Sequence, residues 1–111
     1  MQDISVYFRA LGDRKRLGIL QYLAGHEQVP VTELGEKLRL SQPLISWHLR
    51  VLRRAGVVKT RRTGRQVLCS LNRQALRKYQ DRIDEILGLE DRNVRPTGER
   101  LEQSLEPMPH S

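Results

Sequence analysis

The stretch that decides the fold covers residues 40–56 and reads LSQPLISWHLRVLRRAG. Apolar residues recur in it at helical spacing and predict a stripe along one side of a helix. This stripe consists of Ile45, Leu49 and Leu52. Ser41 is the expected N-cap, and Pro43 fits the first turn, where its missing N–H costs nothing. Gly56 can adopt the left-handed conformation that ends a helix, so the sequence defines both ends of this helix.

The other side of the predicted helix is polar and basic. It carries Ser46, Trp47, Arg50, Arg53 and Arg54. A helix that docks by an apolar stripe and presents polar and basic groups outward suits the major groove of DNA. Gln42 could form paired hydrogen bonds to adenine, and Ser46 could donate to a base edge or a phosphate.

Two residues of this helix have two interpretations each. His48 lies at the edge of the apolar stripe, where it is either a packed histidine that fixes the helix or a direct contact to DNA. Trp47 points outward, where it either touches a thymine methyl or a sugar, or covers a neighbouring helix. The sequence alone leaves both pairs of alternatives open.

The net charge of +7 is unevenly distributed along the 111 residues. Residues 39–82 hold twelve Lys and Arg against one acidic residue, which gives +11. Residues 83–111 hold three Arg against seven acidic residues, which gives −4. The basic block coincides with the predicted polar helix face, as in nucleic-acid-binding proteins. Residues 89–111 have few apolar side chains, three Pro and many charges, and are predicted to be a mobile charged tail.

Three further helices are predicted before the DNA-facing one. The first ends at Gly12, and the second begins after an Asp13 cap and ends at Gly25. The second is expected to be mostly buried through Leu17, Leu20 and Leu23, with Ile19 and Tyr22 nearby. A short extended piece at residues 29–31 precedes a third helix, which Thr32 caps and which runs to about Leu38. Two helices joined by a short link, the second basic on one side, predict a helix-turn-helix.

A β-hairpin is predicted directly after Gly56. The runs VVKTRR and RQVLCSL flank Thr63-Gly64 and are rich in β-branched residues. Val67, Cys69 and Leu71 alternate onto one face of the second strand. The tip of the hairpin carries Arg61, Arg62 and Arg65, which can reach phosphates or an adjacent minor groove. The hairpin is therefore interpreted as a wing.

A last helix is predicted from an Asn72 cap to about Gly88, with an apolar stripe that a single small domain does not obviously cover. We expect two copies to pair this stripe together with the first helix; the alternative is packing within one domain. The expected dimer residues are Ile4, Tyr7, Phe8, Leu76, Tyr79, Ile83, Ile86 and Leu87. Residues 1–88 are thus predicted to form one DNA-binding and dimerisation domain. It is mainly α, with about five helices plus a two-stranded wing.

The order of these elements resembles the ArsR/SmtB family of bacterial winged-helix regulators. The resemblance is carried by ALGDRKRLGIL at residues 10–20, by LSQPLISWHLRVLRRAGVV, and by RRTGRQV, and it covers residues 7–87. It implies a homodimer that binds an inverted repeat in double-stranded operator DNA, usually as a repressor released by a signal. It also implies recognition contacts at Ser41, Gln42, Ser46 and His48, and wing contacts at Arg62 and Arg65. The DNA-binding residues predicted in all are Ser41, Gln42, Pro43, Ser46, Trp47, His48, Arg50, Arg53, Arg62 and Arg65.

The signal that such a regulator would sense is not evident from the sequence. Family members that sense soft metals use a Cys-x-Cys pair in the third helix, but here that region reads VPVTELGE. Members that sense zinc or nickel use Asp and His ligands on the last helix, which here offers Asp81, Asp84 and Glu85 without His. Cys69 is alone and is expected to be a small buried hydrophobe. No metal or cofactor is therefore predicted and the effector is unknown, although a site built from carboxylates with His26 or His110 stays an alternative.

Other classes of function receive little support. No nucleophile triad, phosphate-binding glycine loop or paired carboxylate in a recognisable context predicts an enzyme. A winged-helix module that binds a protein or RNA is the alternative that deserves weight. No membrane-spanning run and no apolar signal core are evident, and a single cysteine agrees with a reducing compartment, so a cytoplasmic protein is expected.

Overall fold

The computed structural model describes residues 3–89 of the chain. The chain forms two compact units, Met1–Gln80 and Asp81–Ser111, so that the last helix begins in the first unit and ends in the second. The tail predicted for residues 89–111 lies outside the described residues except for Leu89, which is exposed.

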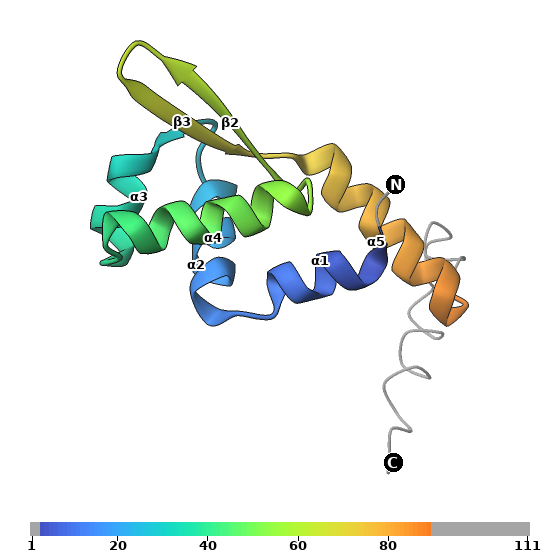
Figure 1. The fold of residues 1–111 in the computed structure, drawn as a ribbon. Coiled ribbons are helices and arrows are strands. Elements are labelled where there is room, and N and C mark those ends of the chain that lie inside the picture. The colour runs from blue at the N-terminus through green and yellow to red at the C-terminus, as the bar shows by residue number, and fades with distance from the viewer. Residues whose placement is uncertain (1–2, 90–111) are drawn as a thin grey trace. The chain divides into compact units, whose positions relative to one another are not determined.

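The described residues form five helices and three strands in the order expected of a winged helix-turn-helix (Figure 1). They are α1 (Ile4–Leu11), α2 (Arg14–Ala24), β1 (Val29–Pro30), α3 (Val31–Leu38), α4 (Gln42–Arg54), β2 (Val58–Thr63), β3 (Gln66–Leu71) and α5 (Arg73–Leu87). The predicted fold class is confirmed. The extended piece before α3 pairs with β3, so the sheet has three antiparallel strands in the order β1-β3-β2 rather than the two of the predicted wing.

Side-chain caps set several helix starts as predicted. The Asp13 carboxylate accepts from the backbone N–H groups of Lys15 and Arg16 at 2.8 and 3.2 Å. Ser41 accepts from Leu44 N–H at 3.4 Å, and Asn72 Oδ1 accepts from Ala75 N–H at 3.2 Å. These caps satisfy N–H groups that have no partner within their own helix.

The predicted Thr32 cap is wrong. Helix α3 begins at Val31, and its N-cap is Pro30, which has no side-chain hydrogen bond to offer. The reason is tertiary: Pro30 is held in extended backbone by pairing with Leu68 of β3, and the helix begins directly after the strand. Thr32 therefore falls inside the first turn of α3.

The core of the first unit is built from the inner faces of α1 to α4, the sheet and the start of α5. The largest side chains buried in it are Ile19, Leu23, Leu34, Ile45, Leu52, Val29, Val57 and Cys69. The predicted stripe of α4 is confirmed, since Ile45, Leu49 and Leu52 are all buried.

Leu17 was expected in this core, and that prediction is wrong: its side chain is 49% exposed. The buried positions of α2 are Arg16, Ile19 and Leu23, so the inner face of this helix starts one residue earlier. An arginine thus occupies the place that an apolar pattern assigns to leucine.

The link between α3 and α4 is a tight turn. Arg39 adopts the left-handed conformation with φ of 57°, and the Leu40 N–H donates to Gly35 O at 2.9 Å. A Cβ atom at Gly35 would lie 3.2 Å from Leu40 O, closer than most real Cβ contacts. Glycine at this position therefore permits the close approach of the turn to α3.

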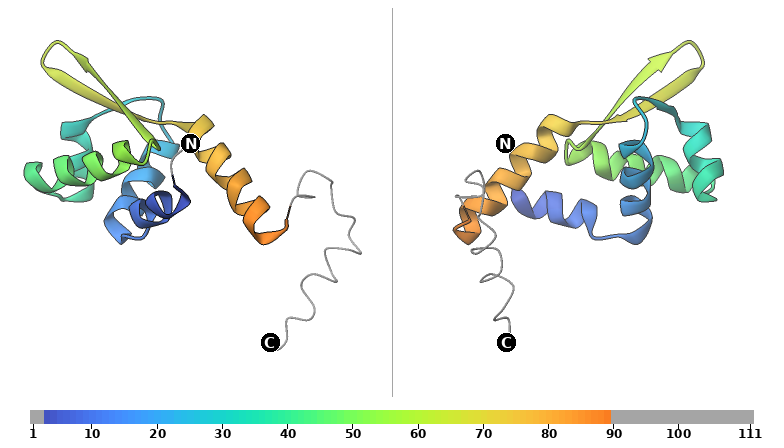
Figure 2. Two further views of the ribbon diagram at one scale, coloured as in Figure 1. Left: turned by 45° about the vertical axis from the view of Figure 1, so that its right-hand side comes forward. Right: turned by 180° about the vertical axis from the view of Figure 1, so that it is seen from behind.

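The wing is confirmed as a regular hairpin. Strands β2 and β3 pair from Val58↔Leu71 to Thr63↔Gln66, and Gly64 in the turn has φ of 61°. Positive φ at a two-residue hairpin turn favours glycine, because side chains on Cβ clash there. The hairpin tip projects beyond the helices of the first unit (Figure 2).

The first half of α5 is tied to the core through Tyr79. Its hydroxyl donates to Ala55 O at 2.6 Å, and its ring stacks on Tyr7 with centroids 4.2 Å apart. Both tyrosines were expected at a dimer interface, and both are buried within one protomer. Their rings therefore pack inside the protomer, which is the alternative considered for this part of the stripe.

We expect Tyr79→Phe to lower the free energy of unfolding by about 1–3 kcal/mol, because a buried carbonyl at Ala55 loses its donor. Chemical denaturation at one fixed protein concentration measures the change. Tyr22→Phe is the control, since its hydroxyl bonds to Glu33 in a part-buried place and its loss leaves no buried group behind. An equal effect of the two substitutions would contradict a special role for the Tyr79 bond.

Candidate nucleic-acid interface

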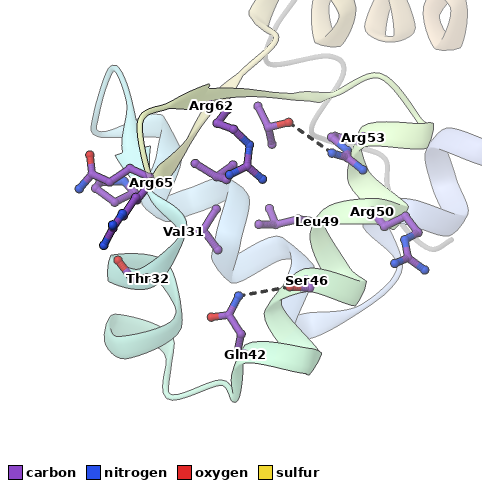
Figure 3. Close-up of a pocket in the computed structure, with 13 residues that line it drawn as sticks. Val31, Thr32, Gln42, Ser46, Leu49, Arg50, Arg53, Arg62 and Arg65 are labelled. Carbon is purple, nitrogen blue, oxygen red and sulfur yellow. Dashed lines mark hydrogen bonds between the residues drawn. The ribbon is translucent and has the colours of Figure 1, made fainter.

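A groove with a volume of about 430 Å³ lies between α4, the start of α3 and the wing (Figure 3). It is lined by Pro30, Val31, Thr32, Gln42, Ser46, Leu49, Arg50, Arg53, Thr60, Arg62, Arg65, Gln66 and Val67. Apolar side chains from α3, α4 and β3 contribute to it, and arginines come from both α4 and the wing. The sequence predicted DNA contacts for α4 and for the wing as two separate elements, and the groove brings these two elements together.

Four arginines line this groove, which we call the arginine groove. They are Arg50 and Arg53 on α4, and Arg62 and Arg65 on the wing. All four are exposed, and Arg53 Nη1 donates to Thr60 Oγ1 at 3.3 Å, which links the helix to β2 (Figure 3). Four guanidinium groups around one groove favour an anionic ligand with several charges, such as a phosphodiester backbone.

Gln42 and Ser46 lie one helical turn apart at the start of α4. Gln42 Nε2 donates to Ser46 Oγ at 3.3 Å, and both side chains are exposed in the groove (Figure 3). With its oxygen engaged as an acceptor, the Ser46 hydroxyl keeps its proton for an outside partner. The amide of Gln42 keeps one N–H and its oxygen for the same purpose.

The other predicted residues of α4 lie elsewhere. Ser41 is engaged as the N-cap, and Pro43 is exposed in the first turn. Trp47 is half exposed, does not line the groove, and lies 5.4 Å from the guanidinium carbon of Arg16, so it covers part of α2. His48 is only 5% exposed, with Nδ1 3.1 Å from Arg16 Nη1. These placements agree with the packed alternative for His48 and with the covering alternative for Trp47.

The wing arginines divide into two groups. Arg62 and Arg65 line the groove, whereas Arg61 donates to Thr63 Oγ1 at 3.2 Å and to Gln28 Oε1 at 3.1 Å. Sequence reasoning placed all three at the tip but could not separate them. It also missed Val31, Thr32 and Gln66 as groove residues, because their positions depend on how β1 pairs with β3.

No metal site is evident among residues 3–89: they contain no group of three or more His, Cys, Asp or Glu side chains suited to hold an ion. His26 stacks on Tyr22, and its Nδ1 lies 2.8 Å from Tyr22 O. His110 lies outside the described residues. Burial raises the pKa of the Cys69 thiol to about 11, against a weaker opposing effect of Arg53, so little thiolate forms near neutral pH. Within the described part of the chain, no helix is long and apolar enough to cross a membrane.

Comparison with known proteins identifies the same elements. Residues 11–61 match the model of a helix-turn-helix domain family. An uncharacterized HTH-type transcriptional regulator of Methanocaldococcus jannaschii, MJ1325, is 37% identical over 84 residues, which cover 76% of this chain and 86% of that protein. A transcriptional repressor SmtB homolog of Synechocystis is 33% identical over 86 residues, covering 77% of this chain and 64% of that protein.

Another relative, the transcriptional activator HlyU of Vibrio cholerae, is 40% identical over 67 residues, covering 60% of this chain and 61% of that protein. Among solved structures, an ArsR-like transcriptional regulator from Rhodococcus is 26% identical with a TM-score of 0.70, covering 95% of this chain and 94% of that one. These relatives are regulators of transcription rather than enzymes. The chain thus belongs to the ArsR/SmtB family of winged helix-turn-helix, DNA-binding transcriptional regulators.

Proposed function

We propose that this regulator is a homodimer that binds an inverted repeat in operator DNA and represses transcription by occupying it. The observation that carries the proposal is the arginine groove between the recognition helix α4 and the wing. Its basic rim suits the backbone of double-stranded DNA, and its position beside the exposed face of α4 suits a helix inserted in the major groove.

Within this arrangement, Gln42 and Ser46 read base edges in the major groove. Their mutual hydrogen bond orients the Gln42 amide, and an oriented amide can form paired hydrogen bonds to adenine. The groove arginines bind phosphates on either side, and Arg62 and Arg65 extend these contacts to the adjacent minor groove. Ser41 and Pro43 shape the start of α4, while Trp47 lies at the edge of the contact and His48 orients the helix from within.

For the dimer, we propose pairing through α1 and α5. Phe8 is 53% exposed on α1, and Ile86 and Leu87 are 53% and 64% exposed near the end of α5. Ile4, Leu76 and Ile83 are partly exposed and extend these apolar stripes, whereas Tyr7 and Tyr79 support them from inside the protomer. Symmetric pairing of two such protomers would present two recognition helices to two half-sites.

We propose that the protein represses rather than activates transcription, because a dimer bound to an operator excludes other proteins from that DNA. Relatives with both senses exist: the SmtB homolog is a repressor and HlyU an activator. A reporter gene placed behind the bound sequence measures the sense directly. Since the proposed ligand is chromosomal DNA, we expect the protein to act in the cytoplasm.

The proposal is tested by selecting duplexes from a random library with the full chain and footprinting the selected sequence. We expect a symmetric footprint with half-sites about one helical turn, roughly 34–36 Å, apart. Binding should weaken steeply as salt rises. Selection of RNA or of protein partners in parallel, with no sequence preference on duplex DNA, would favour the alternative of a winged-helix module with another ligand.

Base reading by α4 makes a separate prediction. Gln42→Ala and Ser46→Ala should lower the ratio of operator to random-DNA affinity by about five- to a hundredfold each, because one good base contact is worth about 1–3 kcal/mol. Arg62→Ala and Arg65→Ala should weaken both DNAs alike, and competition binding at fixed salt separates the two patterns. Equal loss on both DNAs for all four substitutions would show that α4 does not read bases.

The signal is predicted not to be a common metal. Zinc, nickel or arsenite at low micromolar concentration should shift operator affinity by less than about tenfold, or 1.4 kcal/mol of coupling. Operator titration with and without each ion measures this shift. A tight metal site in calorimetry, one per protomer, coupled to DNA release and lost in His26→Ala, would contradict the prediction and identify a site built from histidine and carboxylates.

A further inference from the structure

Arg16 is a buried cation whose donors are directed at the end of α1. The residue is 7% exposed, its Nε donates to Ala10 O at 2.7 Å, and its Nη2 donates to Arg9 O at 3.3 Å. These carbonyls belong to the last turn of α1, where the helix dipole is negative, and Arg9 O also accepts from the Gly12 N–H at 3.2 Å. Arg16 therefore caps the C-terminus of α1 from the neighbouring helix α2.

The remaining amino group of Arg16 faces the recognition helix. Nη1 lies 3.1 Å from His48 Nδ1, and the guanidinium carbon lies 5.4 Å from the centre of the Trp47 ring. A guanidinium stays protonated and has no acceptor, so Nη1 must donate and His48 Nδ1 must accept. His48 is consequently neutral in this arrangement, with its proton on Nε2.

We propose that Arg16 is a positioning residue that fixes the recognition helix α4 relative to α1 through one guanidinium. His48 and Trp47, which Arg16 contacts, lie on the same turn of α4 as Ser46 and Arg50 of the arginine groove. A change at Arg16 would therefore tilt the groove face of α4. We call this contact of Arg16 with the end of α1 and with His48 the Arg16 link. Its effect on DNA binding rests on the proposed function. If α1 also pairs with a second protomer, the Arg16 link would connect the recognition helix to the dimer interface.

The link depends on the protonation of His48. Burial lowers the pKa of His48; Asp13 raises it, and the cations Arg16 and Lys15 lower it further. Asp13 Oδ2 lies 4.0 Å from Arg16 Nη1, so one carboxylate faces this cluster together with the two cations. A protonated His48 would place an imidazolium against the guanidinium with no acceptor between them.

The sign of the pH dependence follows from these charges. The pKa of His48 is lower in the folded protein than its ordinary value of 6.5, so the unfolded chain binds this proton more tightly. The contribution of the Arg16–His48 contact to the free energy of unfolding is therefore complete above about pH 6.5, and it is lost as the pH falls below that value.

Three variants of the full chain separate positioning from simple packing. Arg16→Lys keeps a cation at the end of α1 but lacks the planar fork that reaches α1 and α4 together. His48→Asn keeps an acceptor close to the place of Nδ1, and this acceptor does not titrate. Arg14→Lys is the matched control, because it makes the same exchange at an exposed position of the same helix.

Trp47 supplies a readout that needs no DNA. It is the single tryptophan of the chain, and its ring centroid lies 5.2 Å from that of His48, so protonation of the imidazole should quench its fluorescence. We expect a fluorescence transition below about pH 6.5 in the wild type and in Arg14→Lys. The transition should be absent in His48→Asn and should move toward the ordinary histidine value in Arg16→Lys.

The DNA readout uses the selected operator and random duplex at about pH 7.5, where His48 is neutral. Arg16→Lys should weaken operator binding about tenfold with little change on random DNA, while Arg14→Lys should stay within about threefold of wild type. His48→Asn, which keeps an acceptor for Arg16, should lose less operator affinity than Arg16→Lys. Thermal denaturation checks that each variant is folded, and His48→Asn keeps the test open if Arg16→Lys does not fold.

Two outcomes would overturn the proposal: the same behaviour of Arg16→Lys and Arg14→Lys in both readouts, or an unchanged fluorescence transition in His48→Asn. A transition that depends on His48 and Arg16 in a wild-type protein that binds no duplex DNA would support the positioning role and refute the proposed function instead.

Discussion

Replacing the four groove arginines with glutamine should abolish operator binding at physiological salt. The changes are Arg50→Gln, Arg53→Gln, Arg62→Gln and Arg65→Gln. Each side chain is exposed and lines the same groove, so the substitutions remove charge without opening the core. Each lost phosphate contact reduces the slope of log affinity against log salt by about 0.9, and a dimer would lose up to eight contacts. We expect affinity to fall by more than about a thousandfold.

The measurement is a titration of operator affinity against salt concentration. The slope of log affinity against log salt reports the number of phosphate contacts, and the affinity extrapolated to high salt reports the contacts that do not depend on charge. A matched control removes four exposed basic side chains outside the groove: Arg9→Gln, Arg77→Gln, Lys78→Gln and Arg82→Gln. The control substitutions lower the net charge by the same four units as the groove substitutions, so both quadruple variants experience the same long-range effect of net charge on DNA binding. The control should keep most of the slope; an equal loss in both quadruple variants would show that the arginine groove is not the interface.

The parts of the fold that the sequence predicted well are those decided by neighbours along the chain. Asp13, Ser41 and Asn72 cap helices through N–H groups two or three residues away. Gly56 and Gly64 take positive φ at a helix end and at a hairpin turn. Such interactions are complete within a few residues, so the local pattern was sufficient to place them.

The predictions that failed depend on distant parts of the chain. Thr32 is not a cap because β1 pairs with β3 and carries extended backbone up to Pro30. Leu17 is exposed because Arg16 occupies the inner face of α2, where the carbonyls of α1 and the ring of His48 accept its donors. An apolar pattern cannot anticipate a buried cation whose partners lie on two other helices.

The candidate site shows the same division. The basic face of α4 and the arginines of the wing were evident from spacing and charge, since both follow from periodicity. That these residues line one groove was not evident from the sequence, because the groove forms only through the pairing register of β1 with β3 and the packing of α3 on α4. The exclusion of Arg61 from this groove likewise depends on Gln28, thirty-three residues away.

Introducing Asp at both Ile86 and Leu87 should convert the proposed dimer into a folded monomer. Both side chains are exposed, so the carboxylates cost little in an isolated protomer. In a dimer that buries this end of α5, each unpaired carboxylate would be taken out of water, at a cost of several kcal/mol that assembly cannot offset. Substitution of Leu76 and Ile83, which are partly buried, would mix this effect with loss of the fold.

Sedimentation measures the state of assembly, and circular dichroism checks that helices remain. Lys78→Asp is the control, since it adds a carboxylate, with the same change in net charge, at an exposed position of α5 outside the apolar stripe. The monomer should also lose the operator while keeping weak binding to a single half-site, because two linked recognition helices raise affinity through effective concentration. A double variant that still sediments as a dimer would show that the two copies meet through another surface, and α1 with Phe8 would then be the next surface to alter.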